Sequence, residues 1–296
     1  MRSRTATARL AAALAATAIA TAGCTDAAGG SPTPPAAGVA EPGFGHIHGL
    51  GLNPADGHVY AATHHGVFQL DDGDAQRVAD HYQDTMGFTI TGPDRFLASG
   101  HPALDQEGPP HLGLIASDDA GQSWEPVALQ GEVDFHALSV VGDTVYGWDS
   151  TAGTVMRSDD AGASWVEGAQ LPALDLDVNP ADPAQALATS PDGLLESRDG
   201  GLTFAPAEVQ PPRPLVFVDH LPASAAAGPV LAGADAGGAI WTWDGTAWSE
   251  VGSLPSAPQA FTVAEPARWL AATDSGVFTS SDRGASWRRI AVTASG

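Results

Sequence analysis

The sequence of 296 residues contains one cysteine, Cys24, and no lysine. A single cysteine cannot form an intrachain disulfide, and it cannot build a thiolate metal cluster within one chain. Lysine and arginine together number 12 against 35 acidic residues, so the formal net charge is −23. This imbalance argues against nucleic acid and anionic lipid headgroups as partners, because both require a cationic surface.

The first 23 residues have the pattern of an export signal. Arg2, Arg4 and Arg9 form a basic beginning, and a short apolar run from Leu10 to Ala22 follows. This run is too short to span a bilayer as a stable helix. We therefore expect residues 1–23 to act as a signal peptide.

Cys24 follows the signal directly, and its surroundings resemble a bacterial lipobox, although Thr21 stands where leucine is usual. The resemblance implies a lipid on Cys24 and a protein anchored at the extracytoplasmic face of the cell membrane. An ordinary cleaved signal with an incidental thiol is the alternative. Residues 24–42 are rich in glycine, proline and alanine, and we expect them to form a flexible tether.

A phrase of eight residues, Ser-x-Asp-x-Gly-x-Ser/Thr-aromatic, occurs four times in the chain. The first serines lie 41, 39 and 83 residues apart, and the last gap is close to two periods. A period near forty with short apolar segments between the copies indicates a β-propeller with one four-stranded blade per repeat. The defining positions are Ser117, Asp119, Gly121 and Trp124; Ser158, Asp160, Gly162 and Trp165; Ser197, Asp199, Gly201 and Phe204; and Ser280, Asp282, Gly284 and Trp287.

The phrase resembles the Asp-box, or BNR repeat, of sialidases and other propellers. In that family the turn joins the third and fourth strands of a blade and faces away from the ligand side. The resemblance therefore implies that the aspartates of the four copies are structural. The residue types fit such a turn, because Asp and Ser bond main-chain amides and Gly supplies a positive φ. The chain after the signal also looks like bacterial lipoproteins labelled as Asp-box glycosyl hydrolases.

Residues 43–293 divide into six units of about forty residues, which predicts an all-β, six-bladed propeller. Seven blades would need a further unit that the sequence does not supply. Two units carry degenerate boxes, at residues 71–73 and 243–248. The first unit already contains four strand-like segments, so the way in which the ring closes stays open.

Most of the histidines map to one face of this propeller. The chain enters each blade at the innermost strand, so the starts of the first strands and the turns between second and third strands share a face. Only His58 and His220 map elsewhere. The eight histidines on the shared face, all in blades one to three, are His46, His48, His64, His65, His81, His101, His111 and His136.

Such a gathering of imidazoles predicts a transition-metal site at the mouth of the central channel. Alternation along a strand lets His46 and His48 share one ion, and a thioether would favour copper, especially Cu(I), over zinc. The alternative is a rim of ordinary polar residues, with Met86 packed in the core. The expected ligands are His46, His48, His136, Met86, His64 and His101, with Asp84, Asp134, His65 and Asp149 as further ligands or as partners that orient the rings.

Two other functions remain open. True sialidases resemble one another in an arginine triad, whereas the arginines here lie mostly in or beside the boxes, as Arg198 and Arg283 do. A different glycoside hydrolase would need two carboxylates on the ligand face, and it is the kind of enzyme we would expect if the protein is one. A scaffold for assembling other proteins is the third possibility. We expect a monomer that binds a metal ion or small ligand without catalysis, and the sequence identifies no protein partner.

Overall fold

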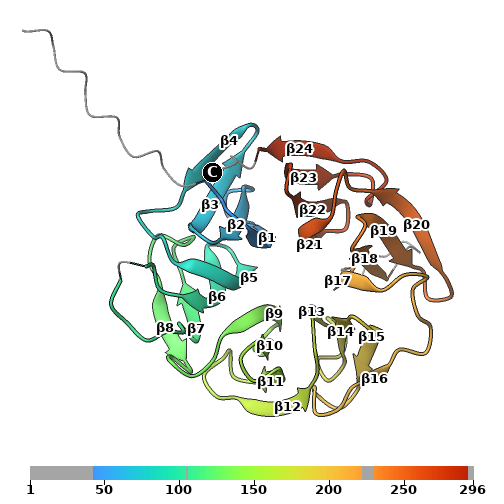
Figure 1. Cartoon of the computed structure of the whole chain (residues 1–296), viewed down its shortest axis with the longest axis horizontal. Helices are drawn as coiled ribbons and strands as arrows, with labels where there is room; N and C mark the ends of the chain where they lie inside the picture. Colours follow the sequence, from blue (N-terminus) through green and yellow to red (C-terminus); the bar gives the residue numbers. More distant parts are fainter. Residues whose placement is uncertain (1–42, 105, 222–229, 293–296) are drawn as a thin grey trace, which may run out of the picture. The chain divides into compact units, whose positions relative to one another are not determined.

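The computed structural model describes residues 43–104, 106–221 and 230–292, and within these ranges the chain forms six four-stranded antiparallel sheets and no helix. The six sheets are arranged as blades around a central opening, so the predicted six-bladed propeller is confirmed (Figure 1). The expected signal peptide, the tether and Cys24 lie outside the described residues. In the described part, no helix is long and apolar enough to cross a membrane.

Each blade is built from four consecutive strands. The first three blades contain β1 (Ile47–Leu52), β2 (Val59–Thr63), β3 (Gly66–Asp71) and β4 (Asp74–Arg77); β5 (Asp84–Gly92), β6 (Arg95–His101), β7 (Leu114–Ser117) and β8 (Glu125–Ala128); and β9 (Phe135–Val141), β10 (Thr144–Asp149), β11 (Thr154–Ser158) and β12 (Val166–Gln170). The last three contain β13 (Asp175–Val178), β14 (Ala186–Ser190), β15 (Gly193–Ser197) and β16 (Ala205–Pro206); β17 (Leu215–His220), β18 (Leu231–Asp235), β19 (Ala239–Trp243) and β20 (Trp248–Ser253); and β21 (Pro258–Glu265), β22 (Arg268–Thr273), β23 (Gly276–Ser280) and β24 (Arg288–Ala291).

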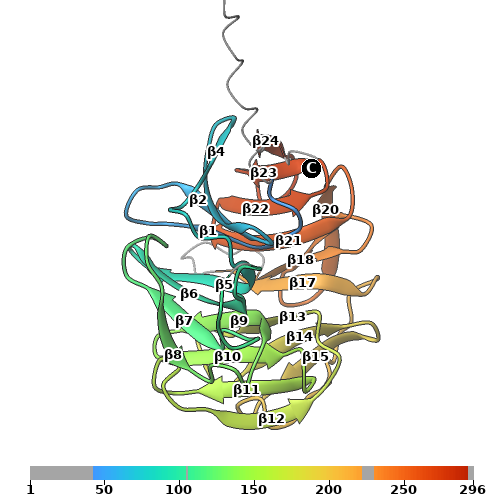
Figure 2. The same ribbon diagram turned by 60° about the vertical axis from the view of Figure 1, so that its left-hand side comes forward.

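The strand order within every blade follows the sequence, with the first strand innermost (Figure 1). The strands that surround the opening are therefore β1, β5, β9, β13, β17 and β21, and each contacts the next around the ring. Figure 2 shows the same blades turned by 60° about the vertical axis. This order places the beginning of every innermost strand at one face of the propeller.

The ring closes by packing and not by a shared strand. All four strands of the first blade come from residues 47–77, and all four of the last blade come from residues 258–291. The main-chain N–H of Ile47 on β1 donates to Oε1 of Gln259 on β21 at 3.2 Å. Ile47 and Leu50 lie in one buried cluster with Ala260 and Leu270 of the last blade. Apolar burial between the two sheets therefore joins the ends of the ring.

Acidic side chains bind the free edges of two innermost strands in the channel. An edge strand leaves main-chain N–H groups without a strand partner. Asp175 on β13 accepts the N–H of Val218 on β17 at 2.9 Å, and Asp219 on β17 accepts the N–H of Val263 on β21. Each carboxylate thus ties its own blade to the next blade.

Burial of these carboxylates, followed by their mutual repulsion, raises their pKa values. Burial raises the pKa of Asp175 to about 7, and the neighbouring Asp177 adds to the rise. Burial, followed by the charges of Asp177 and Asp175, raises the pKa of Asp219 as well. Part of this acidic wall therefore stays protonated well above the pH at which an ordinary aspartate ionises.

We predict that Asp175→Asn stabilises the protein in a pH-dependent way. The amide oxygen can still accept the N–H of Val218, but the ionisable group is gone. The pKa of this carboxyl rises from 3.8 to about 7 on folding. The free energy of unfolding of the parent therefore falls as the pH rises through that window, by at most about 1.4 kcal/mol per pH unit. The melting temperature of the variant should exceed that of the parent at pH 8 and match it near pH 4. Asp192→Asn, in an exposed turn, is the control for loss of one charge, and an equal difference at both pH values would contradict the prediction.

The four Asp-boxes form one kind of turn between the third and fourth strands of a blade. In the second copy, the buried Ser158 accepts the N–H of Gly162 at 2.8 Å, and Asp160 accepts the N–H and hydroxyl of Ser164 at 2.8 and 2.6 Å. The indole N–H of Trp165 donates to the carbonyl of Gly162. The serine and aspartate bonds recur in the other three copies, and the four box glycines have φ between 83° and 90°. The serine and aspartate side chains of the boxes are therefore engaged in stabilising the turns.

We predict that Ser158→Ala costs about 1–3 kcal/mol of unfolding free energy, because it leaves the buried N–H of Gly162 without its acceptor. Ser164→Ala removes a hydroxyl from the same turn at an exposed position and should cost less, because water can replace the lost bond. Chemical denaturation of the two variants and the parent measures both values. A cost for Ser164→Ala equal to or above that of Ser158→Ala would contradict this account of the turn.

Candidate metal site

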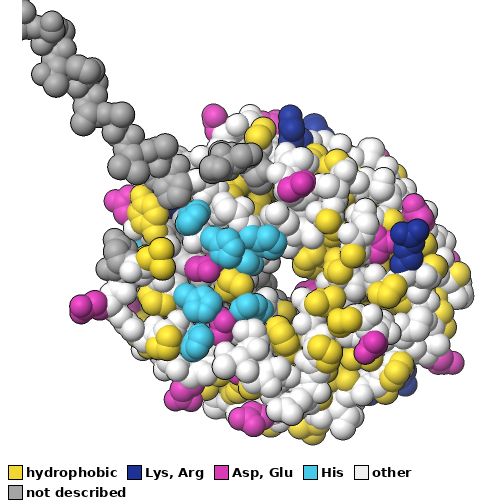
Figure 3. Space-filling model, viewed as in Figure 1, with side chains coloured by type: hydrophobic (Ala, Val, Ile, Leu, Met, Phe, Trp, Pro, Cys, Tyr) yellow, Lys and Arg dark blue, Asp and Glu magenta, His cyan; other side chains and the backbone are white. Residues whose placement is uncertain are grey.

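Histidine side chains gather in two patches beside the central opening on one face of the propeller (Figure 3). The topology explains this placement, because strand starts and turns between second and third strands meet there. His48 lies on β1, His64 in the turn after β2, and His101 at the end of β6. His111 lies in the loop that leads to β7, and His136 lies on β9. All five come from the first three blades.

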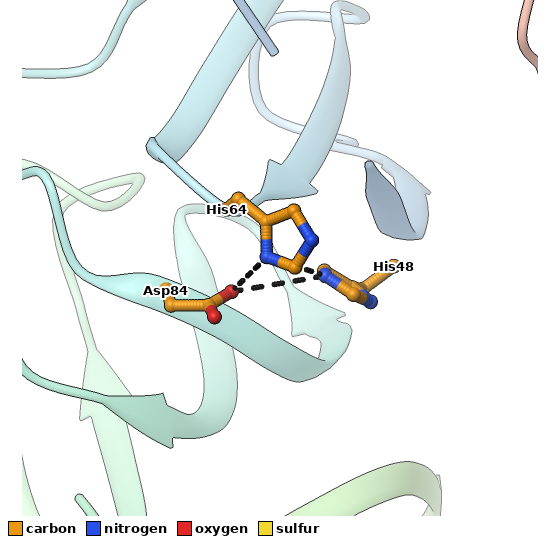
Figure 4. A group of neighbouring side chains, drawn as sticks. All are labelled: His48, His64 and Asp84. Carbon is orange, nitrogen blue, oxygen red and sulfur yellow. Dashed lines mark hydrogen bonds and ion pairs between the residues drawn. The ribbon is translucent and has the colours of Figure 1, made fainter. Parts of the chain in front are cut away.

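The first cluster consists of His48, His64 and Asp84 (Figure 4). Nδ1 of His64 lies 2.9 Å from Oδ1 of Asp84, and Nε2 of His48 lies 3.3 Å from the same Nδ1. Nε2 of His48 is 3.7 Å from Oδ1 of Asp84. Contact between β1 and β5 brings the first two blades together here. Two ring nitrogens and one carboxylate oxygen therefore converge on one point.

The protonation state of His48 suits a ligand. Its side chain is only 12% exposed, and burial, then the charges of His46 and His64, lowers its pKa to about 3. The ring is neutral at physiological pH, so a lone pair is free for a cation. In the tautomer that carries its proton on Nδ1, the Nε2 of His48 that faces His64 and Asp84 is the free nitrogen.

The second cluster consists of His101, His111 and Asp134, whose candidate ligand atoms all lie within 4.8 Å of one another. Nε2 of His101 is 3.4 Å from Oδ2 of Asp134. That oxygen also accepts Nε2 of His136 at 2.8 Å and the hydroxyl of Ser150 at 3.0 Å. Asp134 is 5% exposed, and the bond and charge of His136 lower its pKa although burial opposes this. The carboxylate is therefore ionised and fixed in place.

Asp84 connects the two clusters. It pairs with His101 across the β5–β6 ladder, so its second oxygen, Oδ2, lies 3.8 Å from Nδ1 of His101. The first oxygen faces His64 and His48. One carboxylate thus faces histidines of both clusters.

Four other predicted ligands or ligand partners, His46, His65, Asp149 and Met86, are not members of either cluster. The exposed ring of His46 lies next to that of His48, with centroids 4.7 Å apart and planes tilted by 45°, while His65 lies beside Gly45. Asp149 is not free, because its two oxygens accept main-chain N–H groups of the turn after β10. Met86 is partly buried on β5, two residues after Asp84, and both clusters form without its sulfur.

Two histidines differ from their expected roles. His81 was expected on the shared face, but its Nε2 donates to the carbonyl of Gln122, inside the first Asp-box. His111, which the sequence placed on this face without marking it as a ligand, belongs to the second cluster. The available signal was that His101 and His111 flank one loop between β6 and β7, whose two ends must lie close together.

Different side chains line the two sides of the cavity in the central channel. A cavity of about 510 Å³ is lined by His48 and His136 on one side and by Asp175, Asp177 and Asp219 on the other. The described lining residues include no arginine. A carboxylate-binding arginine triad of the sialidase kind is therefore missing from the described part of this cavity, in agreement with the sequence.

No family model matches the chain, and no curated protein matches it. Solved structures with the same fold do exist. The GH74 xyloglucanase from Xanthomonas campestris aligns with a TM-score of 0.53 and 20% identity over 84% of this chain and 46% of its own. The GH74 enzyme of Niastella koreensis aligns with a TM-score of 0.60 and 14% identity over 85% and 46%. YCF48 bound to a D1 peptide aligns with a TM-score of 0.53 and 18% identity over 84% and 83%.

These likenesses establish the β-propeller fold and no more. The identities are low, and this chain spans less than half the length of the GH74 chains. The same fold serves a hydrolase in one case and a peptide-bound protein in another. A propeller by itself licenses no activity, so function has to be argued from the histidine face.

Proposed function

We propose that the protein binds a divalent transition-metal ion at His48, His64 and Asp84. The observation that carries the proposal is the spacing of their three ligand atoms, 2.9, 3.3 and 3.7 Å. Ligands about 2.0–2.1 Å from a tetrahedral ion lie roughly 3.3 Å from one another. The three separations bracket that value, so one ion can contact all three atoms with little movement.

Copper is favoured over zinc for this site. Two imidazoles and a carboxylate are ligands for both ions, and divalent copper binds such nitrogen and oxygen donors more tightly than zinc does. A thioether ligand would favour Cu(I), and the role of Met86 as that ligand stays a prediction. The choice of copper therefore depends on the general order of affinities, since the near-tetrahedral spacing of the three atoms by itself is the geometry of zinc.

Binding without turnover fits the surroundings of the site best. The role we propose is storage, delivery or sensing of the metal, by a protein that a lipid on Cys24 holds outside the cytoplasmic membrane. The location rests on residues 1–24 of the sequence alone. The chain carries 35 acidic residues against 12 arginines, and a protein of such negative charge attracts cations.

Glycoside hydrolysis is the second candidate, because GH74 enzymes share the fold. Two carboxylates at the ends of second strands, one on β10 and one on β18, are already engaged in turns. Asp149 accepts the N–H groups of Thr151 and Ala152, and Asp235 accepts those of Gly237 and Ala239. Release of reducing sugar from xyloglucan by the metal-free protein would favour the hydrolase over the metal-binding function.

We predict that the purified, untagged protein binds Cu(II) with a dissociation constant below about 1 µM, equivalent to about −8 kcal/mol. Competition with a chromophoric chelator measures the affinity. Changing both His48 and His64 to alanine should weaken binding at this site at least about 100-fold, because two of three ligands are lost. His58→Ala, a histidine outside both clusters, is the matched control and should bind as the parent does. Failure of the parent to bind Cu(II) or Zn(II) would overturn the proposal.

A further inference from the structure

The second cluster contains buried polar atoms that lack partners. Oδ1 of Asp134 and Nδ1 of His111 are both buried and make no hydrogen bond with any other described group. A buried carboxylate oxygen without a donor is costly, because it has lost its water and gained nothing in return. His136 and Ser150 satisfy only the other oxygen, Oδ2. The free oxygen of this 5% exposed aspartate is a ready position for a cation.

We propose that His101, His111 and Asp134 hold a second metal ion, and that Asp84 lies between this ion and the first. The inference rests on the proposed function and extends it from one ion to two. Two imidazoles and one carboxylate form each cluster, so both offer the same chemistry. Each set leaves a position for water or an exogenous ligand.

The position of Asp84 supports a coupled pair of sites. Its Oδ1 contacts His64 and its Oδ2 lies 3.8 Å from Nδ1 of His101. Each oxygen of this carboxylate can therefore bind one ion. Alternatively, one oxygen can bind the first ion while the other orients a histidine ligand of the second. The carboxylates of Asp84 and Asp134 offset two of the four positive charges of two divalent ions.

His136 takes the part of a positioning residue in this arrangement. Its Nε2 donates to Oδ2 of Asp134 and thereby fixes the orientation of this carboxylate, whose Oδ1 has no partner. Loss of such a supporting hydrogen bond usually weakens metal binding about 10–100-fold. His136→Ala should weaken binding of the second ion by that factor and leave the first unchanged. His136→Gln, which keeps a donor, should recover part of the loss.

Equilibrium dialysis against Cu(II), with elemental analysis of the protein, tests the inference. The parent should retain two ions per chain, His111→Ala one ion, and His64→Ala one ion. Electron paramagnetic resonance gives a readout that needs no variant, because two neighbouring Cu(II) ions in the parent should produce a half-field transition. That transition should disappear in His111→Ala, and His101→Ala serves as a second variant if the first does not fold.

The possible failures are distinguishable. A parent that retains no ion overturns the proposed function together with this inference. A parent that retains one ion and shows no half-field transition overturns the second site alone. Two ions per chain in both His111→Ala and His101→Ala would place the second ion elsewhere and would also overturn it.

Discussion

Entry of the chain at the innermost strand of every blade is the constraint on which the rest of this structure depends. It brings the beginnings of β1, β5 and β9 to one mouth of the central channel, next to the turns that follow β2 and β6. Residues far apart in sequence thereby become neighbours, as His48 and Asp84 do. The Asp-boxes, at the turns between third and fourth strands, hold the blades without taking part in this mouth.

The propeller separates two kinds of polar chemistry around its channel. Blades one to three present imidazoles with Asp84 and Asp134, while blades four and five present carboxylates that bind the free N–H groups of neighbouring inner strands. The second group has a structural reason to be acidic, because each carboxylate joins two blades. The first group has no such reason, since atoms of Asp134 and His111 stay buried without partners. A bound cation would supply the missing contact.

Much of the fold could be predicted from the sequence because its repeats are short-range. The turn of an Asp-box is decided within eight residues, and four copies at a period near forty fix the number of blades even where two boxes have degenerated. Closure of the ring could not be predicted, since it depends on packing between Ile47 and residues beyond 258. No local pattern records such a contact between the ends of a chain.

The candidate site was predictable only as a face. Topology placed His48, His64 and His101 together, but the identity of each partner depends on the register of strands and the path of a loop. His111 joins His101 because the loop between β6 and β7 returns, and Asp149 is lost to a turn because its carboxylate finds nearer amides. His81, which was expected on the shared face, contacts a main-chain carbonyl of an Asp-box for the same reason. Side-chain partners of this kind are decided by distances of a few ångströms, which a residue pattern does not contain.

Anomalous diffraction from crystals of the copper-loaded protein, measured on both sides of the copper absorption edge, tests the central claim most directly. The account predicts an anomalous peak about 2 Å from Nε2 of His48, Nδ1 of His64 and an oxygen of Asp84. A copper-loaded crystal with no peak at these three atoms, or with peaks only at exposed carboxylates, would contradict the claim that this face of the propeller is a metal site.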